Sequence, residues 1–261
     1  MSDDPAALLE LAAVAATKAG ALLRTRFDAG SERAVASKST PTDLVSEADL
    51  AAQRAIRTLL ASERPDDGFL GEEEDGADDT GSSGLRWIFD PLDGTINFLF
   101  GIPQWCVSVA VEDSRGTLAG AICDPLRSES FTALRGGPAK LNGNELRGST
   151  ETQLDRAMVA TGFAYDAAVR NAQGEVLAGL LSRVRDVRRF GSAALDLAWC
   201  AAGRYDAYFE RTVKPWDIAA GVLLCRCAGM EIRELEAANR LPYGILVAPP
   251  AIGRELHELV A

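Results

Sequence analysis

Histidine is almost absent from this chain of 261 residues, which has a single one, His257, near its C-terminus. No motif for a serine or cysteine nucleophile stands out either. His257 follows helical spacing beside Leu256 and Leu259, which favours a packing or surface position. The scarcity of these groups argues against catalysis by a histidine base or by a covalent nucleophile.

Positive charge is also scarce. The chain has 27 Lys and Arg against 38 Asp and Glu, which gives a formal net charge of −11 at pH 7. Nonspecific binding of nucleic acid needs a cationic surface, so we expect no nucleic-acid partner. One basic cluster is formed by Arg183, Arg185, Arg188 and Arg189. Its spacing favours a strand with a solvated edge, while a role at an interface or in binding an anionic substrate near Gly191 stays open.

Long uninterrupted apolar runs are lacking as well. The N-terminus is acidic, and the apolar stretch after it is broken by Glu10 and Lys18. It therefore matches neither a signal peptide nor a membrane span, and we expect a cytoplasmic protein with no membrane partner. The five cysteines are an odd number and lie mostly in apolar segments, which favours reduced core thiols. Cys225 and Cys227 fall within an expected helix, which disfavours a zinc or redox pair.

Apolar residues make up 47% of the chain, enough for a sizeable core. Residues 8–23 and 48–60 follow the spacing of amphipathic helices. Alternating apolar residues separated by turns over 105–134 predict an antiparallel meander. We expect an α/β (α+β layered) fold with an N-terminal half, residues 1–148, and a C-terminal half, residues 149–261, in one compact body.

The most informative segment is Trp87–Phe98, which ends an apolar run in two acids, Asp90 and Asp93, followed by Gly-Thr. The apolar run suits a buried strand, and Pro91 should end its pairing because proline has no amide hydrogen. The residues that follow predict a turn into a short helix with free amides. Two carboxylates so close would repel each other unless a cation lay between them, and Mg²⁺ suits oxygen ligands. The alternative is that both aspartates only cap and turn the chain after the strand.

Further acids lie where strands and helices should begin or end. Glu72 and Glu73 follow a short apolar segment and are candidates for a metal ligand and a base. Asp217 lies at an expected helix start, where on its own it would be an N-cap. The acids that follow Glu73 are better explained as a solvated loop, and they are Glu74, Asp75, Asp78 and Asp79.

In order and spacing, these segments resemble the inositol monophosphatase family of Mg²⁺-dependent, lithium-sensitive phosphatases. The similar segments are Gly71–Glu73, Trp87–Phe98 and Trp216–Gly221, with a fourth, Lys38–Asp49, that resembles the family's mobile loop and helix start. Three ordered motifs are much harder to obtain by chance than one. The resemblance implies a five-layer αβαβα sandwich with the site between the halves, and a homodimer.

The resemblance also implies two or three Mg²⁺ ions per subunit, with Mn²⁺ as a substitute and Li⁺ as an inhibitor. Glu72, Asp90 and the backbone carbonyl of Leu92 would hold the first ion. Asp90, Asp93 and Asp217 would hold the second, and a weaker third ion would bind near Glu72.

The same resemblance implies the roles of the other site residues. Thr95, hydrogen-bonded to Asp49, would orient the attacking water together with Glu72, and the amides of Gly94 and Thr95 would receive the phosphate. Lys38 and Glu73 are accessory positions. The implied substrate contacts are Asp93, Gly94, Thr95, Gly191, Ala193 and Glu210.

Glu210 would accept hydrogen bonds from sugar or cyclitol hydroxyls, the alternative being an exposed acid at a strand end. The leading hypothesis is hydrolysis of myo-inositol monophosphate, a small phosphorylated metabolite. Histidinol phosphate, fructose 1,6-bisphosphate and 3′-phosphoadenosine 5′-phosphate are alternative substrates. A hypothesis of another class is a noncatalytic metal- or phosphometabolite-binding protein or a regulatory partner, against which the complete acidic set counts.

Overall fold

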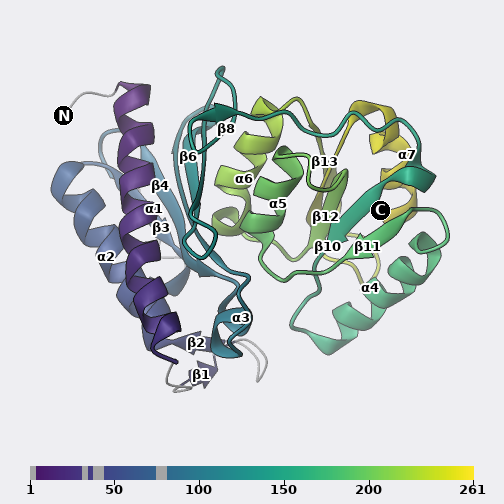
Figure 1. Ribbon diagram of the computed structural model, residues 1–261, viewed down its shortest axis with the longest axis horizontal. Coiled ribbons are helices and arrows are strands. Elements are labelled where there is room, and N and C mark those ends of the chain that lie inside the picture. Colours follow the sequence, from purple (N-terminus) through teal and green to yellow (C-terminus); the bar gives the residue numbers. More distant parts are fainter. Residues whose placement is uncertain (1–3, 31–34, 38–43, 75–80) are drawn as a thin grey trace.

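Two β-sheets and three layers of helices alternate in the computed structural model, which describes residues 4–30, 35–37, 44–74 and 81–261 (Figure 1). The order of layers is α1 with α2, the first sheet, α5 with α6, the second sheet, and α4 with α7. The expected five-layer αβαβα sandwich is therefore confirmed.

The first sheet has seven strands in the order β3-β4-β5-β6-β7-β8-β9. Its strands are β3 (Gly68–Gly71), β4 (Arg86–Asp93), β5 (Cys106–Asp113), β6 (Gly116–Asp124), β7 (Glu129–Leu134), β8 (Lys140–Leu141) and β9 (Asn144–Glu145). β3 and β4 are parallel, and the strands from β4 onward pair antiparallel, which confirms the expected meander. A separate short pair, β1 (Val35–Ser37) and β2 (Leu44–Ser46), precedes this sheet in the chain.

The end of β4 differs from the sequence expectation. The strand does not end at Asp90 but continues through Pro91 to Asp93. Asp90 pairs with Ser108 and Asp93 with Cys106, so the register shifts by one residue between them. Proline removes one donor, and a β-bulge accommodates the missing bond without ending the strand. Both aspartates consequently lie on the same strand, on either side of the bulge.

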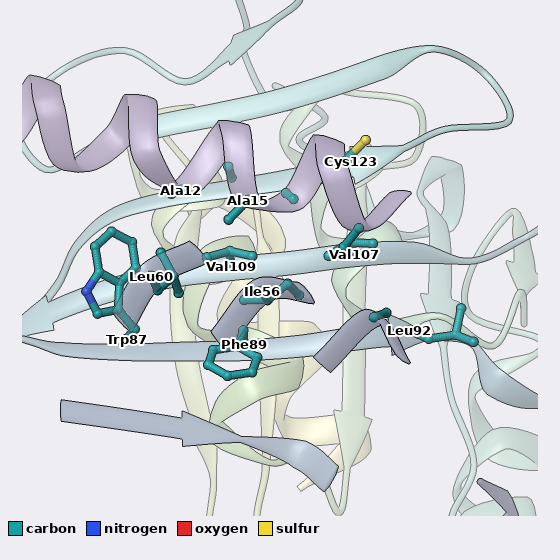
Figure 2. Packing of buried hydrophobic residues seen from close by; sticks show 14 of the residues in the cluster. Ala12, Ala15, Ile56, Leu60, Trp87, Phe89, Leu92, Val107, Val109 and Cys123 are labelled. Atoms are coloured by element: carbon teal, nitrogen blue, oxygen red, sulfur yellow. The ribbon is translucent and has the colours of Figure 1, made fainter. Parts of the chain in front are cut away.

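The helices α1 (Pro5–Asp28) and α2 (Glu47–Glu63) cover the outer face of the first sheet. By length and composition alone, α1 is apolar enough to cross a membrane. In the structure its buried face is rich in alanine, and Ala12, Ala15 and Ala19 lie in the core beside Val107 and Val109 (Figure 2). The small side chains allow close packing on the sheet, and we therefore interpret α1 as a core helix of a soluble protein.

The second sheet has five strands in the order β11-β10-β12-β14-β13. These are β10 (Met158–Thr161), β11 (Asp186–Arg188), β12 (Ala207–Arg211), β13 (Glu231–Leu235) and β14 (Gly244–Ala248). β10, β11 and β12 are parallel, whereas β14 pairs antiparallel with both β12 and β13. The helices α4 (Ala167–Leu180) and α7 (Pro250–Val260) lie on its outer face.

Between the sheets lie α5 (Ala193–Ala201) and α6 (Pro215–Cys227). They pack so closely that a methyl group on Gly221 would lie 2.5 Å from Cβ of Leu197. The remaining short elements are η1 (Glu72–Glu74), α3 (Thr95–Leu99) and η2 (Leu154–Arg156). A division of the chain after residue 148 remains our proposal, and the two sheets fall on either side of it. All five cysteines are free, and four of them are buried.

Candidate active site

Acidic residues from both sheets line one open cavity of about 850 Å³. Most of the residues expected at the site from the sequence lie in its wall: Glu72, Asp90, Leu92, Asp93, Gly94, Thr95, Gly191, Ala193, Glu210 and Asp217. Asp49 and Glu73 are not among the residues that line it, and Lys38 falls outside the described residues. The structure therefore brings together segments that are far apart in the sequence.

The turn between β4 and α3 fixes one side of the cavity. Oδ1 of Asp90 accepts a hydrogen bond of 2.9 Å from the amide of Leu92 across the bulge. Gly94 has a φ of 99°, and a methyl group there would lie 2.9 Å from the carbonyl oxygen of Gln104. Only glycine suits this conformation and this close approach. The amides that begin α3 come before its first helical hydrogen bond, from Phe98 to Gly94, and are available to an anion.

Thr95 connects this turn to α2. Its hydroxyl lies 2.8 Å from Oδ1 of Asp49 and 3.0 Å from the carbonyl oxygen of Leu92. Asp49 is the third residue of α2, and its other oxygen accepts from the amide of Ser46, the N-cap, at 2.9 Å. The hydrogen bond between Thr95 and Asp49 that the family resemblance implied is thus present. Burial raises the pKa of Asp49, an effect opposed by the hydrogen bonds from Ser46 and Thr95.

Asp93 is held by the C-terminal half of the chain. The Ser192 hydroxyl and the Ala194 amide each donate to Oδ2 at 2.7 Å, and the Ala193 amide donates to Oδ1 at 3.2 Å. These groups form the N-terminus of α5, where the helix dipole favours a negative charge. Ala193 is one of the substrate contacts that the resemblance implied, and in this structure its amide orients the Asp93 carboxylate.

Asp217 is not the N-cap of α6, which was the alternative that the sequence offered for this residue on its own. The N-cap of α6 is Lys214, and Pro215 is the first helical residue, which makes Asp217 the third. Its Oδ2 accepts a hydrogen bond of 2.7 Å from the Lys214 amide. An acid at this position still stabilises the helix start, and its carboxylate lines the cavity.

The cavity wall concentrates buried negative charge. Burial raises the pKa of Asp90 well above its ordinary value, and the charges of Glu72, Asp93 and Asp217 raise it further. Burial followed by the charge of Asp93 likewise raises the pKa of Asp217. The pKa of Asp93 is raised by burial, against the opposing hydrogen bonds from Ser192 and the α5 amides. Ionising these groups together requires a compensating cation.

Glu210, on β12, lines the same cavity and is not an exposed acid. The Tyr208 hydroxyl donates to its Oε2 at 2.7 Å, and a methyl group on Gly162 would lie 2.0 Å from its carboxyl carbon. Burial raises the pKa of Glu210 to about 7, while the Tyr208 hydrogen bond and the positive charge of Arg189 act against the rise. The alternative of an exposed strand-end acid is therefore wrong.

The four clustered arginines do not act together. Arg183 pairs with Glu255, Arg185 donates to the carbonyl of Arg156, and Arg188 pairs with Asp186. Arg189 alone lines the cavity, which fits the open alternative of a role near an anionic substrate.

Several residues at the site could not be predicted from the sequence. Nothing local to Ser192 indicates its bond to Asp93, which it supports without lining the cavity. The aromatic residues Phe163 and Tyr165 precede α4, and Tyr243 precedes β14. Gln53 of α2 was also missed. Its side-chain oxygen accepts a hydrogen bond of 3.2 Å from the Glu73 amide and so supports the segment that carries Glu72.

Comparison with known proteins identifies the family. The model of the inositol monophosphatase family matches residues 4–261. The chain belongs to the inositol monophosphatase family. An inositol-1-monophosphatase of Rhizobium meliloti is 44% identical over 261 residues, which cover 97% of this chain and 96% of the relative. The Nus factor SuhB of Escherichia coli K12 is 40% identical, with coverage of 92% and 90%. Among solved structures, the extragenic suppressor protein SuhB of Bartonella henselae has a TM-score of 0.88 and 36% identity, covering 97% of this chain and 98% of that one.

Membership of the inositol monophosphatase family confirms the resemblance drawn from the sequence motifs and makes this chain a phosphatase. The match extends well beyond the segment from Lys38 to Gly221 on which that resemblance rested. It includes α1 at one end and the β13–β14 hairpin with α7 at the other.

Proposed function

We propose that this protein is a Mg²⁺-dependent phosphomonoesterase that hydrolyses myo-inositol monophosphate to inositol and phosphate. The observation that carries the proposal is the shared cavity: Glu72, Asp90, Asp93 and Asp217 line it together with the start of α3 and with Glu210. The cavity wall therefore combines acids that we propose to bind cations, amides that we propose to bind the phosphate and a carboxylate that we propose to accept hydrogen bonds from hydroxyl groups.

The chemistry of the acidic residues fits a hard divalent cation. All the proposed side-chain donors are carboxylates, and burial followed by their mutual repulsion raises the pKa of Asp90. Among the described residues, no three His, Cys, Asp or Glu side chains converge closely enough to enclose an ion. In the proposal, Glu72, Asp90, Asp93, Asp217 and the Leu92 carbonyl would hold two Mg²⁺ ions, with Mn²⁺ as a substitute.

Bound Mg²⁺ would supply neutralisation of phosphoryl charge and a lowered pKa for water. The chain's own groups would do the positioning. With its proton donated to Asp49, the Thr95 hydroxyl presents a lone pair that can orient a water molecule, with Glu72 nearby in the cavity wall. The amides of Gly94 and Thr95 at the start of α3 would hold phosphate oxygens.

The alcohol part of the substrate would lie toward the C-terminal half. There Glu210 offers carboxylate oxygens to hydroxyl groups, and Arg189, on the same cavity wall, contributes a positive charge. A polyhydroxylated alcohol such as inositol matches a half-buried acceptor that the Tyr208 hydroxyl already holds in place.

The test is phosphate release from inositol 1-phosphate, histidinol phosphate, fructose 1,6-bisphosphate and 3′-phosphoadenosine 5′-phosphate, each with Mg²⁺ and with a chelator. We expect Mg²⁺-dependent preference for the inositol ester. Preference for another ester would keep the mechanism and replace the substrate. No release from any of them would contradict the proposed activity.

A second candidate function rests on the relative from Escherichia coli that is called a Nus factor. It predicts that this protein also acts as a regulatory partner of other macromolecules. Purification of native complexes with wild-type protein and with an inactive Asp93→Asn variant separates the two functions. Equal capture of partners by both would support a regulatory function independent of hydrolysis, and capture by neither would contradict it.

Three further features belong to the same proposal by family membership. They are a homodimeric assembly, a cytoplasmic location and inhibition by Li⁺ at the second metal site. Light scattering measures the first, and activity measured with increasing Li⁺ measures the last. A lack of inhibition in the millimolar range would argue against a normal second site.

A further inference from the structure

Arg211, the last residue of β12, is a buried arginine that bonds only to backbone carbonyls among the described residues. Its side chain is 2% exposed. One terminal nitrogen donates to the carbonyls of Glu236 at 2.9 Å and Pro242 at 2.8 Å, with Leu235 at 3.4 Å. The other donates to the carbonyl of Val260 at 2.9 Å. A planar guanidinium can serve such divergent acceptors at once, which a lysine ammonium cannot.

The carbonyls of Glu236 and Pro242 belong to the hairpin loop that joins β13 to β14, residues 236–243. Leu235 is the residue just before this loop. The loop turns tightly, because the amides of Ala238 and Leu241 each bond to the other's carbonyl at 2.9 Å. Its last two residues, Pro242 and Tyr243, line the catalytic cavity. Arg211 thus reaches from the strand that carries Glu210 to the base of a loop that forms another part of the wall.

Thr212 makes a second attachment at the same place. Its amide donates to the carbonyl of Tyr243 at 2.8 Å. Its φ is 70°, a left-handed conformation that a β-branched residue rarely adopts. Strained backbone of this kind persists where the surrounding contacts determine it, and it concentrates at functional sites. Thr212 also lines the cavity, so the strain lies in the wall itself.

The attachments of the loop at Arg211 and Thr212 place Tyr243 at the cavity. It is 39% exposed and lies in the cavity wall, as does Tyr165, which is 46% exposed. Exposed aromatic rings in a concave site commonly contact a ligand. At the loop tip, Arg240 forms an exposed ion pair with Glu175.

We propose that Arg211 is a positioning residue that holds the Pro242–Tyr243 wall against Glu210, and that Tyr243 determines specificity for the alcohol part of the substrate. The proposal rests on the proposed phosphatase function, because it concerns the same cavity. The bond to Val260 means that Arg211 also fastens the end of α7, so a purely structural role has to be separated by experiment.

The kinetic test compares Arg211→Met, Arg211→Lys and Tyr243→Ala, with inositol 1-phosphate and Mg²⁺. For Arg211→Met we expect KM to rise about tenfold while kcat stays within about threefold, because ground-state contacts with the alcohol are lost and the metal site is untouched. Arg211→Lys should lie between this variant and wild type. The double variant Arg211→Met/Tyr243→Ala should have a KM no higher than that of Tyr243→Ala, because both changes act through one ring.

Arg240→Ala is the matched control, since it removes an arginine contact to the same loop at its exposed tip. We expect its KM and kcat to equal those of wild type. His257→Ala removes a contact of 3.1 Å between α7 and the Glu234 carbonyl and controls for loosening of α7. An unchanged KM in both Arg211 variants, or a KM effect of Arg211→Met that persists in full without the Tyr243 ring, would overturn the proposal.

Hydrogen exchange of the Ala238, Leu241 and Thr212 amides supplies a readout that does not depend on activity. We expect faster exchange in Arg211→Met than in wild type or Arg240→Ala. If wild type proved inactive on every phosphate ester, slower exchange with Arg211 present would still support the positioning role. Equal exchange in Arg211→Met and wild type would contradict it independently of the proposed function.

Discussion

The hydroxyl of Ser192 lies 2.7 Å from Oδ2 of Asp93, and this bond joins the start of α5 to the end of β4. Close by, Nδ2 of Asn97 donates to the carbonyl of Phe190 at 2.8 Å and to that of Gln104 at 2.7 Å. The orientation of the Asp93 carboxylate therefore depends on how the two halves of the chain meet. The orientation of this proposed metal ligand is determined by packing between the two halves as well as by the strand that carries it.

Asp93→Asn should lower turnover of inositol 1-phosphate by at least about a hundredfold. The amide keeps the shape of the side chain but removes a charge, and it has one acceptor oxygen where the Ser192 hydroxyl and the amides of Ala193 and Ala194 now bond to two. The measurement is the initial rate with saturating Mg²⁺, with circular dichroism to check folding. Asp28→Asn, which changes an exposed acid paired with Arg24, is the control and should leave the rate unchanged. Equal losses from both variants would mean that the site has been assigned to the wrong acids.

Mg²⁺ should stabilise the protein more at about pH 7.5 than at about pH 5.5. The pKa values of Asp90, Asp93 and Asp217 are raised in the folded state. Without metal, the stability that they contribute is complete below their unfolded pKa of about 3.9 and is lost as the pH rises through the folded values. A bound cation reverses this loss. Thermal unfolding with Mg²⁺ and with chelator at both pH values checks the prediction, and an equal gain in Tm at both would contradict it.

The acidic motifs could be predicted from the sequence because their geometry is local. Asp90 and Asp93 lie at the end of a recognisable strand, and the order of three such segments identified the family. The bond between Ser192 and Asp93 spans 99 residues and leaves no local pattern. The alternative of Asp217 as an N-cap was wrong for a different reason. Pro215 takes the first helical position, so the cap is Lys214. Arg211 has a side chain typical of the protein surface, and only the fold shows that four backbone carbonyls surround it.

KM for inositol 1-phosphate should fall as the pH rises through about 7. Glu210→Gln should remove the part of this dependence that comes from the Glu210 carboxyl group. Burial raises the pKa of Glu210 to about 7, so the carboxylate that accepts hydrogen bonds from hydroxyl groups becomes the main form as the pH rises through that value. The raised pKa also means that the contribution of Glu210 to stability is lost as the pH rises through about 7. The variant should therefore be at least as stable as wild type at alkaline pH.

The measurement is KM from about pH 6 to about pH 8 for both proteins. Ionisation of the substrate phosphate affects both alike, so it cancels in their ratio. A ratio that does not vary with pH would argue against Glu210 as the group that contacts the alcohol.

Gly120→Ala should destabilise the protein by about 1–3 kcal/mol and weaken Mg²⁺ binding. A methyl group on Gly120 of β6 would lie 2.9 Å from Cα of Ala220, so α6, which carries Asp217, would have to move away from the first sheet. Gly174→Ala is the matched control, because nothing lies within 4 Å of a methyl group there and the residue is inside α4. That change should leave Mg²⁺ binding unchanged and stabilise the helix by up to about 1 kcal/mol. Thermal unfolding and calorimetric titration with Mg²⁺ measure both effects. Undiminished Mg²⁺ affinity in a clearly destabilised Gly120→Ala protein would show that the spacing between β6 and α6 does not set the position of Asp217.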